Sequence, residues 1–183
     1  MADVFARLRA DHRDLVLLLA PRHPERVPEI ERMLEDRGIR TVRRSRLPTA
    51  RAGAPVVILD TVGELATLYH LAEAVFVGGS LVPTGGHNML EPALRSKPVL
   101  FGPYTSNFRE SAELLIEAGG ARRVADAAEL EAALRELLEK PEIARAMGET
   151  GYQAVVRRQG GVRATLELVE RYLTGAEGER ADG

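Results

Sequence analysis

Residues 78–91, GGSLVPTGGHNMLE, combine residue types that suit the binding of a phosphate group. Glycines can adopt positive φ and leave the main chain open to a close ligand. Gly85 and Gly86 directly precede a predicted helix over about residues 89–95, whose free N–H groups and dipole favour an anion. Pro92 lacks an N–H and is tolerated only in the first helical turn, which places the helix start near Asn88. The stretch therefore predicts a strand–loop–helix phosphate site.

Asn88 and Glu91 have two readings at this helix start. Asn-x-x-Glu has the spacing of a capping box, with Asn88 as the N-cap and Glu91 bonding back to the main chain. The alternative is a ligand role, because a carboxylate that would repel a phosphate can accept hydrogen bonds from a sugar diol. Capping alone does not require four nearby glycines or the adjacent His87, so the pattern favours a nucleotide site.

A second polar group follows the aliphatic run of residues 14–20. Arg22 comes directly after this predicted strand, and a guanidinium can clamp a phosphate or carboxylate through two parallel hydrogen bonds. Arg26 either contacts the same ligand or pairs with Glu25 or Glu29. His23 lies between them and is a further candidate.

Other candidates keep two readings each. Ser80 donates its hydroxyl to a ligand or turns the chain, and Asp60 braces a loop or contacts a ligand. Asn107 caps the helix that it precedes or lies at the mouth of the site. His87 donates to a phosphate or substrate oxygen or shapes the loop. No His-x-x-x-His pair or carboxylate cluster accompanies the histidines, so no metal and no other cofactor is expected.

Alternating strands and helices must position these residues. The predicted strands cover residues 14–20, 39–43, 55–60, 74–77, 98–101 and 121–124. The predicted helices cover residues 3–12, 28–37, 61–69, 89–95, 107–118, 126–139, 141–158 and 162–173. This alternation is typical of an α/β fold with a doubly wound, Rossmann-like parallel sheet. Glu64 has capping-box spacing from Thr61, which favours a capping role for it.

Several segments of this sequence closely resemble the 3-deoxy-D-manno-octulosonate (Kdo) transferases. The matching segments are Ala20–Arg26 (APRHPER), Asp60–Leu65 (DTVGEL), Phe76–Pro83 (FVGGSLVP), Gly85–Pro92 (GGHNMLEP), Lys97–Pro103 (KPVLFGP) and Asn107–Phe108 (NF). The resemblance extends over about residues 1–174, and the joint pattern is far more specific than a lone glycine motif. Tyr104 departs from it, since the family is expected to have histidine there, and no role is carried onto Tyr104.

The resemblance implies a glycosyltransferase of the glycosyltransferase-B fold, which has two Rossmann-like domains. Such enzymes move Kdo from CMP-Kdo to a lipid A precursor in lipopolysaccharide biosynthesis. This chain resembles their C-terminal half, with residues 1–174 as the donor-binding domain and residues 175–183 as a disordered tail. The candidate donor-binding residues are Arg22, His23, Ser80, Gly85, Gly86, His87, Asn88, Glu91 and Asn107.

The family's catalytic acidic residue and acceptor-lipid site are expected in an N-terminal domain that this chain lacks. The isolated domain is therefore expected to be soluble and inactive, and its parent to work on the cytoplasmic side of the inner membrane. Two alternatives remain open: a UDP- or GDP-sugar glycosyltransferase or epimerase domain, and a nucleotide-binding module without catalysis.

Composition excludes several other classes. The chain has 183 residues, 45% hydrophobic and 28% charged, which suits one globular domain. A net charge of −2 and the absence of tryptophan argue against a nucleic-acid partner. There is no cysteine, no signal peptide in the charged residues 1–12, and no apolar run long enough to cross a bilayer. Residues 37–51 hold six arginines and no acid, which predicts either a solvated basic loop or a peripheral contact with anionic lipid headgroups.

Overall fold

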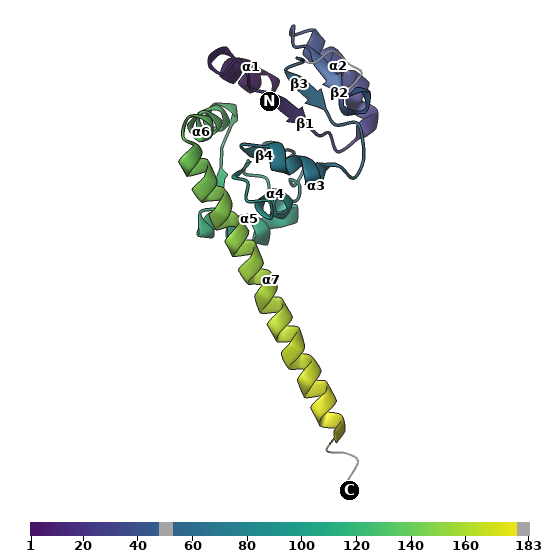
Figure 1. The fold of residues 1–183 in the computed structure, drawn as a ribbon, viewed down its shortest axis with the longest axis vertical. Helices are drawn as coiled ribbons and strands as arrows, with labels where there is room; N and C mark the ends of the chain where they lie inside the picture. Colours follow the sequence, from purple (N-terminus) through teal and green to yellow (C-terminus); the bar gives the residue numbers. More distant parts are fainter. Residues whose placement is uncertain (48–52, 179–183) are drawn as a thin grey trace.

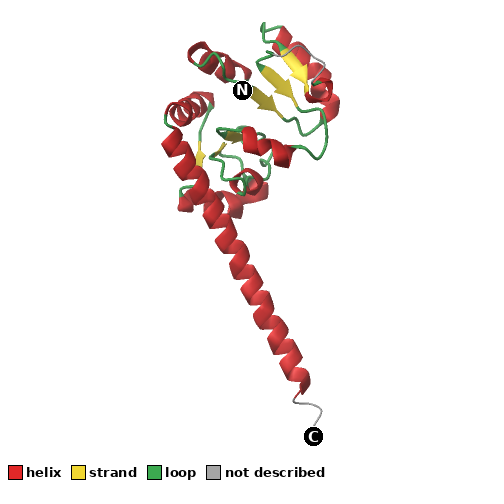
Figure 2. Ribbon diagram, in the orientation of Figure 1, coloured by secondary structure: helices red, strands yellow, loops and turns green. Residues whose placement is uncertain are grey.

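The computed structural model describes residues 1–47 and 53–178, with the backbone alone from residue 161 onward. Strands and helices alternate along most of the chain (Figures 1 and 2). They are α1 (Ala2–Asp11), β1 (Leu17–Leu19), α2 (Val27–Glu35), β2 (Thr41–Arg43), β3 (Val56–Ile58), α3 (Leu65–Leu68), β4 (Val75–Val77), α4 (Leu90–Ala93), β5 (Val99–Phe101), α5 (Arg109–Ala118), β6 (Ala121–Arg123), α6 (Ala127–Glu139) and α7 (Pro141–Gly178). Short 3-10 helices lie at Pro24–Arg26, Arg44–Arg46, Tyr69–Leu71 and Ser106–Phe108.

The strands form two three-stranded parallel sheets, ordered β1-β3-β2 and β4-β5-β6. In register, Val56 of β3 pairs with Leu17 and Thr41, and Val99 of β5 pairs with Val75 and Ala121. The α/β class with parallel strands is therefore confirmed, with its strands distributed over two sheets. The chain passes from the first sheet to the second between β3 and β4, and the strand orders place β1 and β4 each at the edge of its sheet.

The central strands are the most deeply buried. Val99, Leu100 and Phe101 of β5 are fully buried, as are Val56 and Ile58 of β3. A continuous aliphatic run such as residues 14–20 is typical of a strand buried on both faces, but all three residues of β1 are only half-buried. The reason is its place at the edge of the sheet, while β3 takes the centre.

Helix α1 lies along α6 and ties the start of the chain to its later part. Val4 and Leu8 share a buried cluster with Leu130 and Leu137 of α6 and with Leu100 of β5. The short helix that the sequence predicts at residues 3–12 is therefore confirmed as α1.

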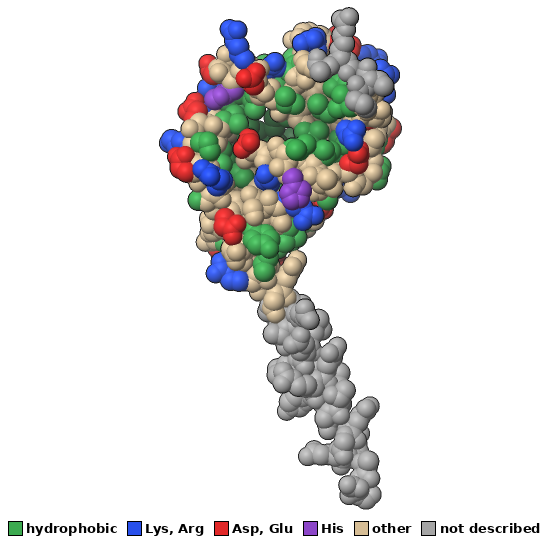
Figure 3. Space-filling model, in the orientation of Figure 1, with side chains coloured by type: hydrophobic (Ala, Val, Ile, Leu, Met, Phe, Trp, Pro, Cys, Tyr) green, Lys and Arg blue, Asp and Glu red, His purple; other side chains and the backbone are tan. Residues whose placement is uncertain are grey.

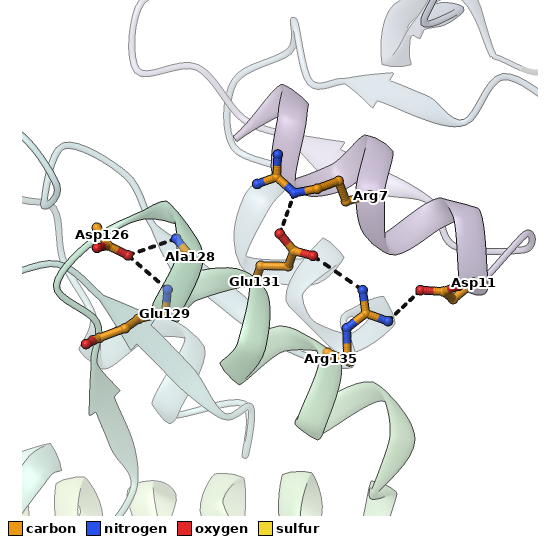
Figure 4. Close-up of polar contacts among 7 residues, drawn as sticks. All are labelled: Arg7, Asp11, Asp126, Ala128, Glu129, Glu131 and Arg135. Carbon is orange, nitrogen blue, oxygen red and sulfur yellow. Dashed lines mark hydrogen bonds and ion pairs between the residues drawn. The ribbon is translucent and has the colours of Figure 1, made fainter.

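Ion pairs border the same contact (Figure 4). Nε of Arg7 lies 2.5 Å from a carboxylate oxygen of Glu131, and Nη1 of Arg135 lies 2.6 Å from a carboxylate oxygen of Asp11. Arg135 also contacts Glu131 at 3.3 Å, which joins the two pairs into one network. Asp126 caps α6 by accepting hydrogen bonds from two backbone N–H groups of its first turn. Helix α6 is thus fixed at its start by a cap and along its side by charge.

Helix α7 is one continuous helix that extends well beyond the body of the molecule (Figure 1). The sequence predicts two helices here, at residues 141–158 and 162–173, and that division is wrong. Gly160 and Gly161 lower helix propensity by only about 1 kcal/mol each and, unlike proline, remove no backbone donor. Of the predicted tail, residues 175–178 belong to α7 and residues 179–183 lie outside the described residues.

Small residues let the first part of α7 approach the body closely. A Cβ on Gly148 would lie 2.0 Å from the carbonyl oxygen of Ser96, at the turn between α4 and β5. A Cβ on Gly120 would lie 2.3 Å from Cα of Gly151. Backbone therefore packs directly on backbone where α7 crosses these two turns. Among the described helices, none combines the length and the apolar character needed to cross a membrane.

Helix α3 begins later than the sequence predicts, at Leu65 instead of Thr61. The expected capping box does not form, because the hydroxyl of Thr61 donates to the Glu64 carboxylate itself. That carboxylate also accepts a hydrogen bond of 2.9 Å from Arg44. Glu64 therefore braces the 3-10 turn after β2 against the start of α3, and its predicted capping role is wrong.

Candidate functional site

The loops that follow β1 and β4 meet at one point. Nη1 of Arg22 lies 3.2 Å from Nδ1 of His87, although 65 positions separate them along the chain. Each loop leaves the carboxyl end of a strand at the edge of a different sheet. In open α/β folds, ligands bind outside the carboxyl ends of the strands, where the strand order reverses. Two of the predicted site residues are thus brought together at the position where such folds bind ligands.

The contact with Arg22 decides which tautomer the neutral His87 ring adopts. A guanidinium can only donate, so Nδ1 of His87 accepts this bond, and the neutral ring carries its proton on Nε2. Burial lowers the pKa of His87 below its ordinary value of 6.5, and the positive charge of Arg22 and then His23 lower it further. The site therefore offers a guanidinium and a neutral imidazole N–H, both of which can donate to an anionic oxygen.

The glycine-rich loop adopts the backbone that the sequence predicts. Gly79, Gly85 and Gly86 have φ of 69°, 88° and 73°, and the N–H of Gly86 donates to the carbonyl of Gly79 over 3.0 Å. Gly78, in contrast, has open space around it, with no heavy atom within 4 Å of where a Cβ would lie. Of the four glycines, Gly78 is the one that leaves room for a ligand to approach the main chain.

Gly85 and Gly86 are in close contact with the protein itself. A Cβ on Gly85 would lie 2.4 Å from Nδ2 of Asn107, and one on Gly86 would lie 3.2 Å from the carbonyl oxygen of Tyr104. The N–H of Asn107 also donates to the carbonyl of Gly85 over 3.2 Å. These glycines therefore allow the loop after β5 to pack against the loop after β4.

The predicted capping box does not form at α4, whose N-cap is Met89 without a side-chain cap. The side-chain oxygen of Asn88 accepts from the N–H of Leu90 over 3.0 Å, as in an Asx turn, and within the described residues Glu91 does not bond back to the main chain. Instead, the side-chain amide of Asn88 donates to one carboxylate oxygen of Glu91 over 3.0 Å. Asn88 thus holds an exposed Glu91 at the edge of the site. Because α4 has only four residues, its dipole is weaker than that of the longer helix predicted from the sequence.

Comparison with known proteins gives the family. The chain is 37% identical over 167 residues to 3-deoxy-D-manno-octulosonic acid transferase of Haemophilus influenzae, covering 91% of this chain and 39% of that protein. It is also 37% identical to the transferase of the same name from Bordetella pertussis, again over 39% of that protein's length. The crystal structure of the C-terminal CMP-Kdo binding domain of WaaA from Acinetobacter baumannii superposes with a TM-score of 0.78 and 31% identity, covering 84% of this chain and 80% of that one.

The chain belongs to the Kdo transferase family. It corresponds to the C-terminal domain of that family, and it spans about two fifths of the length of these transferases. No protein-family model matches the chain.

Within this Kdo transferase domain, Ser80 is a structural residue. Its side chain is fully buried, and its hydroxyl donates to the carbonyl of Val77 over 2.5 Å and accepts from the N–H of Gly102 over 2.8 Å. These bonds tie the end of β4 to the end of β5. The hydroxyl is thus engaged inside the protein, which favours the loop-shaping alternative over ligand contact.

Three further candidates also engage protein partners. Asn107 makes no side-chain cap at α5, because its side chain lies against Gly85. Asp60 accepts from the backbone N–H and the hydroxyl of Ser45, over 2.9 and 2.6 Å, and so braces that loop. Arg26 forms two hydrogen bonds of 3.1 Å with Glu29, as one sequence alternative predicted. The described residues contain no cluster of His, Asp and Glu that could hold a metal ion.

His23 remains exposed beside the site. Its Nδ1 lies 3.1 Å from a carboxylate oxygen of Glu25, in the same loop as Arg22. Its charge contributes to the lowered pKa of His87, and no hydrogen bond joins the two rings among the described residues.

The arginine-rich segment is largely paired with acids from elsewhere in the chain. Arg43 forms a two-bond contact with Glu31, at 2.8 and 2.5 Å, and Arg44 pairs with Glu64. Arg40 donates to the carbonyl of Gly53. Arg51 lies outside the described residues. Figure 3 shows basic and acidic side chains interspersed over one face of the molecule, around a hollow bordered by hydrophobic side chains. A membrane contact through residues 37–51 stays a prediction.

Tyr69 is a residue near the site that the sequence patterns did not indicate. Burial, together with the negative charge of Glu91, raises the pKa of Tyr69 to about 12. Nearby, Nε of Arg95 donates to the carbonyl of Ala66, which joins the end of α4 to α3. Tyr69 therefore belongs to the surroundings of Glu91. No local pattern in the sequence signals this proximity, because it depends on how the 3-10 helix Tyr69–Leu71 lies relative to α4.

Proposed function

We propose that residues 1–174 bind the nucleotide-sugar donor CMP-Kdo, and that the whole protein transfers Kdo from it to a lipid A precursor in lipopolysaccharide biosynthesis. The observation that carries the proposal is the contact between Arg22 and His87 at the carboxyl ends of β1 and β4. The similarity in fold and sequence to the CMP-Kdo binding domain of WaaA from Acinetobacter baumannii supports the same donor.

The polar side chains divide between the parts of this donor. Arg22 and the Nε2–H of His87 would hold the phosphate of CMP, with His23 beside them. Glu91, held by Asn88, would accept hydrogen bonds from the ribose hydroxyls. Gly85, Gly86, Ser80 and Asn107 would set the shape of the loops that carry these groups.

Arg22 also suits the chemical step. When the bond between Kdo and CMP breaks, negative charge grows on the leaving phosphate. A guanidinium already fixed by its contact with His87 stabilises that charge without reorganising during the reaction. In the whole protein, the acidic catalytic residue and the acceptor site would belong to the N-terminal domain, on the cytoplasmic side of the inner membrane.

Nucleotide titration of residues 1–183 by calorimetry tests the donor proposal. CMP should bind more tightly than UMP, GMP or AMP, and Arg22→Ala should weaken CMP binding about tenfold or more, as loss of a charge-assisted hydrogen bond predicts. Arg157→Ala is the control, since Arg157 bonds only to a carbonyl of its own helix within the described structure. Tighter binding of UMP or UDP would instead identify a UDP-sugar enzyme. Absence of all nucleotide binding would refute the proposal.

A transfer assay tests the division of labour between the domains. Residues 1–183 alone should move no Kdo from CMP-Kdo to a lipid A precursor, since one domain cannot close over the donor and exclude water. Measurable transfer by this chain would show that the catalytic residue lies within it.

A further inference from the structure

Tyr69 begins the 3-10 helix that follows α3, in a segment that is tied to the turn after α4. Nε of Arg95 donates to the carbonyl of Ala66 over 3.2 Å. Nζ of Lys97 donates to the carbonyl of His70 over 3.0 Å. These two bonds lie on either side of Tyr69 in the sequence, so they hold it beside α4.

Glu91 lies on the side of α4 that this segment faces. Glu91 and Arg95 are four positions apart, and Ala66 and Tyr69 are three positions apart, which are the spacings of neighbours on one helical side. Since Arg95 reaches Ala66, the turn that carries Glu91 lies beside the turn that carries Tyr69. Burial and then the negative charge of Glu91 raise the pKa of Tyr69 to about 12, which agrees with this arrangement. The phenol therefore keeps its proton and can donate a hydrogen bond beside the carboxylate.

The hydroxyl of Tyr69 is open to a ligand. It forms no hydrogen bond with any residue in the described part of the chain, although Tyr69 is half-buried. Among the described residues, the buried side-chain polar atoms that lack a partner belong to Arg9 and His12. The Tyr69 hydroxyl is not one of them, so it is both unpartnered and accessible from outside.

The carboxylate of Glu91 is also available. Asn88 donates to its Oε1 over 3.0 Å, and Glu91 forms no other hydrogen bond or ion pair within the described residues. A ribose presents two adjacent hydroxyls, and each of them can donate and accept hydrogen bonds. A carboxylate can only accept, whereas a neutral phenol can also donate. The two groups together therefore suit a sugar diol better than the carboxylate alone.

We propose that Tyr69 is a specificity-determining residue of this domain, whose hydroxyl binds one hydroxyl of the ribose while Glu91 binds the other. This inference rests on the proposed nucleotide donor and adds to it a residue outside the glycine-rich loop. The pair selects ribonucleotides over deoxyribonucleotides, because a sugar that lacks either hydroxyl leaves one of the two groups without a ligand partner.

Tyr69→Phe tests the proposal, because it removes the hydroxyl and keeps the ring. Wild type and variant, as residues 1–183, are titrated by calorimetry with CMP, 2′-deoxy-CMP and 3′-deoxy-CMP. Tyr152→Phe is the matched control. Tyr152 lies on α7, is also half-buried, and forms no hydrogen bond through its hydroxyl in the described structure.

We expect Tyr69→Phe to weaken CMP binding about three- to tenfold, as the loss of one neutral hydrogen bond predicts. At least one of the two deoxynucleotides should bind wild type and Tyr69→Phe equally, within about twofold, because it lacks the hydroxyl that Tyr69 contacts. Tyr152→Phe should bind CMP as the wild type does. The melting temperature of free Tyr69→Phe should stay within about 2 °C of the wild type, since the hydroxyl bonds to no described protein group.

Equal CMP affinity of wild type and Tyr69→Phe would overturn the proposal and leave the proposed donor standing. An equal loss of affinity for all three nucleotides would also overturn it, because the effect of Tyr69 would then be independent of the ribose hydroxyls. A similar loss of CMP binding in Tyr152→Phe would have the same consequence. Absence of CMP binding by the wild type would refute the proposed donor itself, and the role of Tyr69 with it.

Discussion

Replacing Gly85 by alanine tests how the two site loops are held together. Gly85 has φ of 88°, a conformation that costs a residue with a Cβ about 1–2 kcal/mol. The new Cβ would lie 2.4 to 2.8 Å from three side-chain atoms of Asn107, so the whole amide must move. That displacement adds about 0.5–1.5 kcal/mol if it forces a poor rotamer. Asn107 should then also lose its fixed position beside the proposed nucleotide site.

Alanine variants of two other glycines distinguish the cost of backbone strain from the cost of the steric clash with Asn107. Gly63 has φ of 89° but no heavy atom within 4 Å of a Cβ, so Gly63→Ala carries the backbone strain alone. Gly78 has neither positive φ nor a close neighbour, so Gly78→Ala carries neither effect. Every Gly→Ala change also stabilises by about 0.4–1 kcal/mol through the unfolded chain. We therefore expect net losses of about 0.5–3 kcal/mol for Gly85→Ala and about 0–1.6 kcal/mol for Gly63→Ala, with none for Gly78→Ala.

Urea and thermal denaturation of the three variants measure these differences. Each 1 kcal/mol should lower the melting temperature by about 2–4 °C in a domain of this size. If Gly85→Ala is as stable as Gly78→Ala, the packing of Asn107 against Gly85 does not constrain the loops. If Gly85→Ala and Gly63→Ala lose equal stability, backbone strain at positive φ explains the loss, and the steric clash with Asn107 contributes nothing.

Three further experiments test the site and the fold. Glu91→Gln should weaken CMP binding about tenfold or more, while the free energy of unfolding changes by less than about 1 kcal/mol. As a control, 2′,3′-dideoxy-CMP should bind the wild type and the variant equally. Lower stability with unchanged CMP affinity would indicate a capping role. The pKa of His87 is lowered in the folded protein, so the unfolded chain binds this proton first as the pH falls through 6.5. Acidification should therefore reduce the free energy of unfolding more in the wild type than in His87→Gln. Equal pH profiles of the two proteins in chemical denaturation would contradict this. A double-mutant cycle on Arg43 and Glu31 should give a coupling free energy of about 1 kcal/mol or more, because two hydrogen bonds join these partly buried groups. A coupling free energy below about 0.3 kcal/mol would show that the pair contributes no more than an ordinary surface ion pair.

Local patterns in the sequence were sufficient for most elements of the fold. The aliphatic runs at residues 74–77 and 98–101 became β4 and β5, because a strand buried in a parallel sheet needs little more than a short run of apolar residues. Gly119 is the left-handed C-cap of α5 with φ of 78°, and Gly38 has φ of 71° in the turn that follows α2. Local patterns were less reliable at helix ends, where α3 began late and α7 continued past two glycines.

The sequence by itself thus determined the α/β class, the order of most elements, the glycine-rich loop and the family. These depend on residues close together along the chain, whose types restrict φ, periodicity and hydrogen bonding directly. Only the tertiary structure decided which polar groups face each other. It placed Arg22 against His87, buried the hydroxyl of Ser80 and packed Asn107 onto Gly85. Partners so distant in sequence leave no local pattern, because their contact depends on how the two sheets and their loops pack.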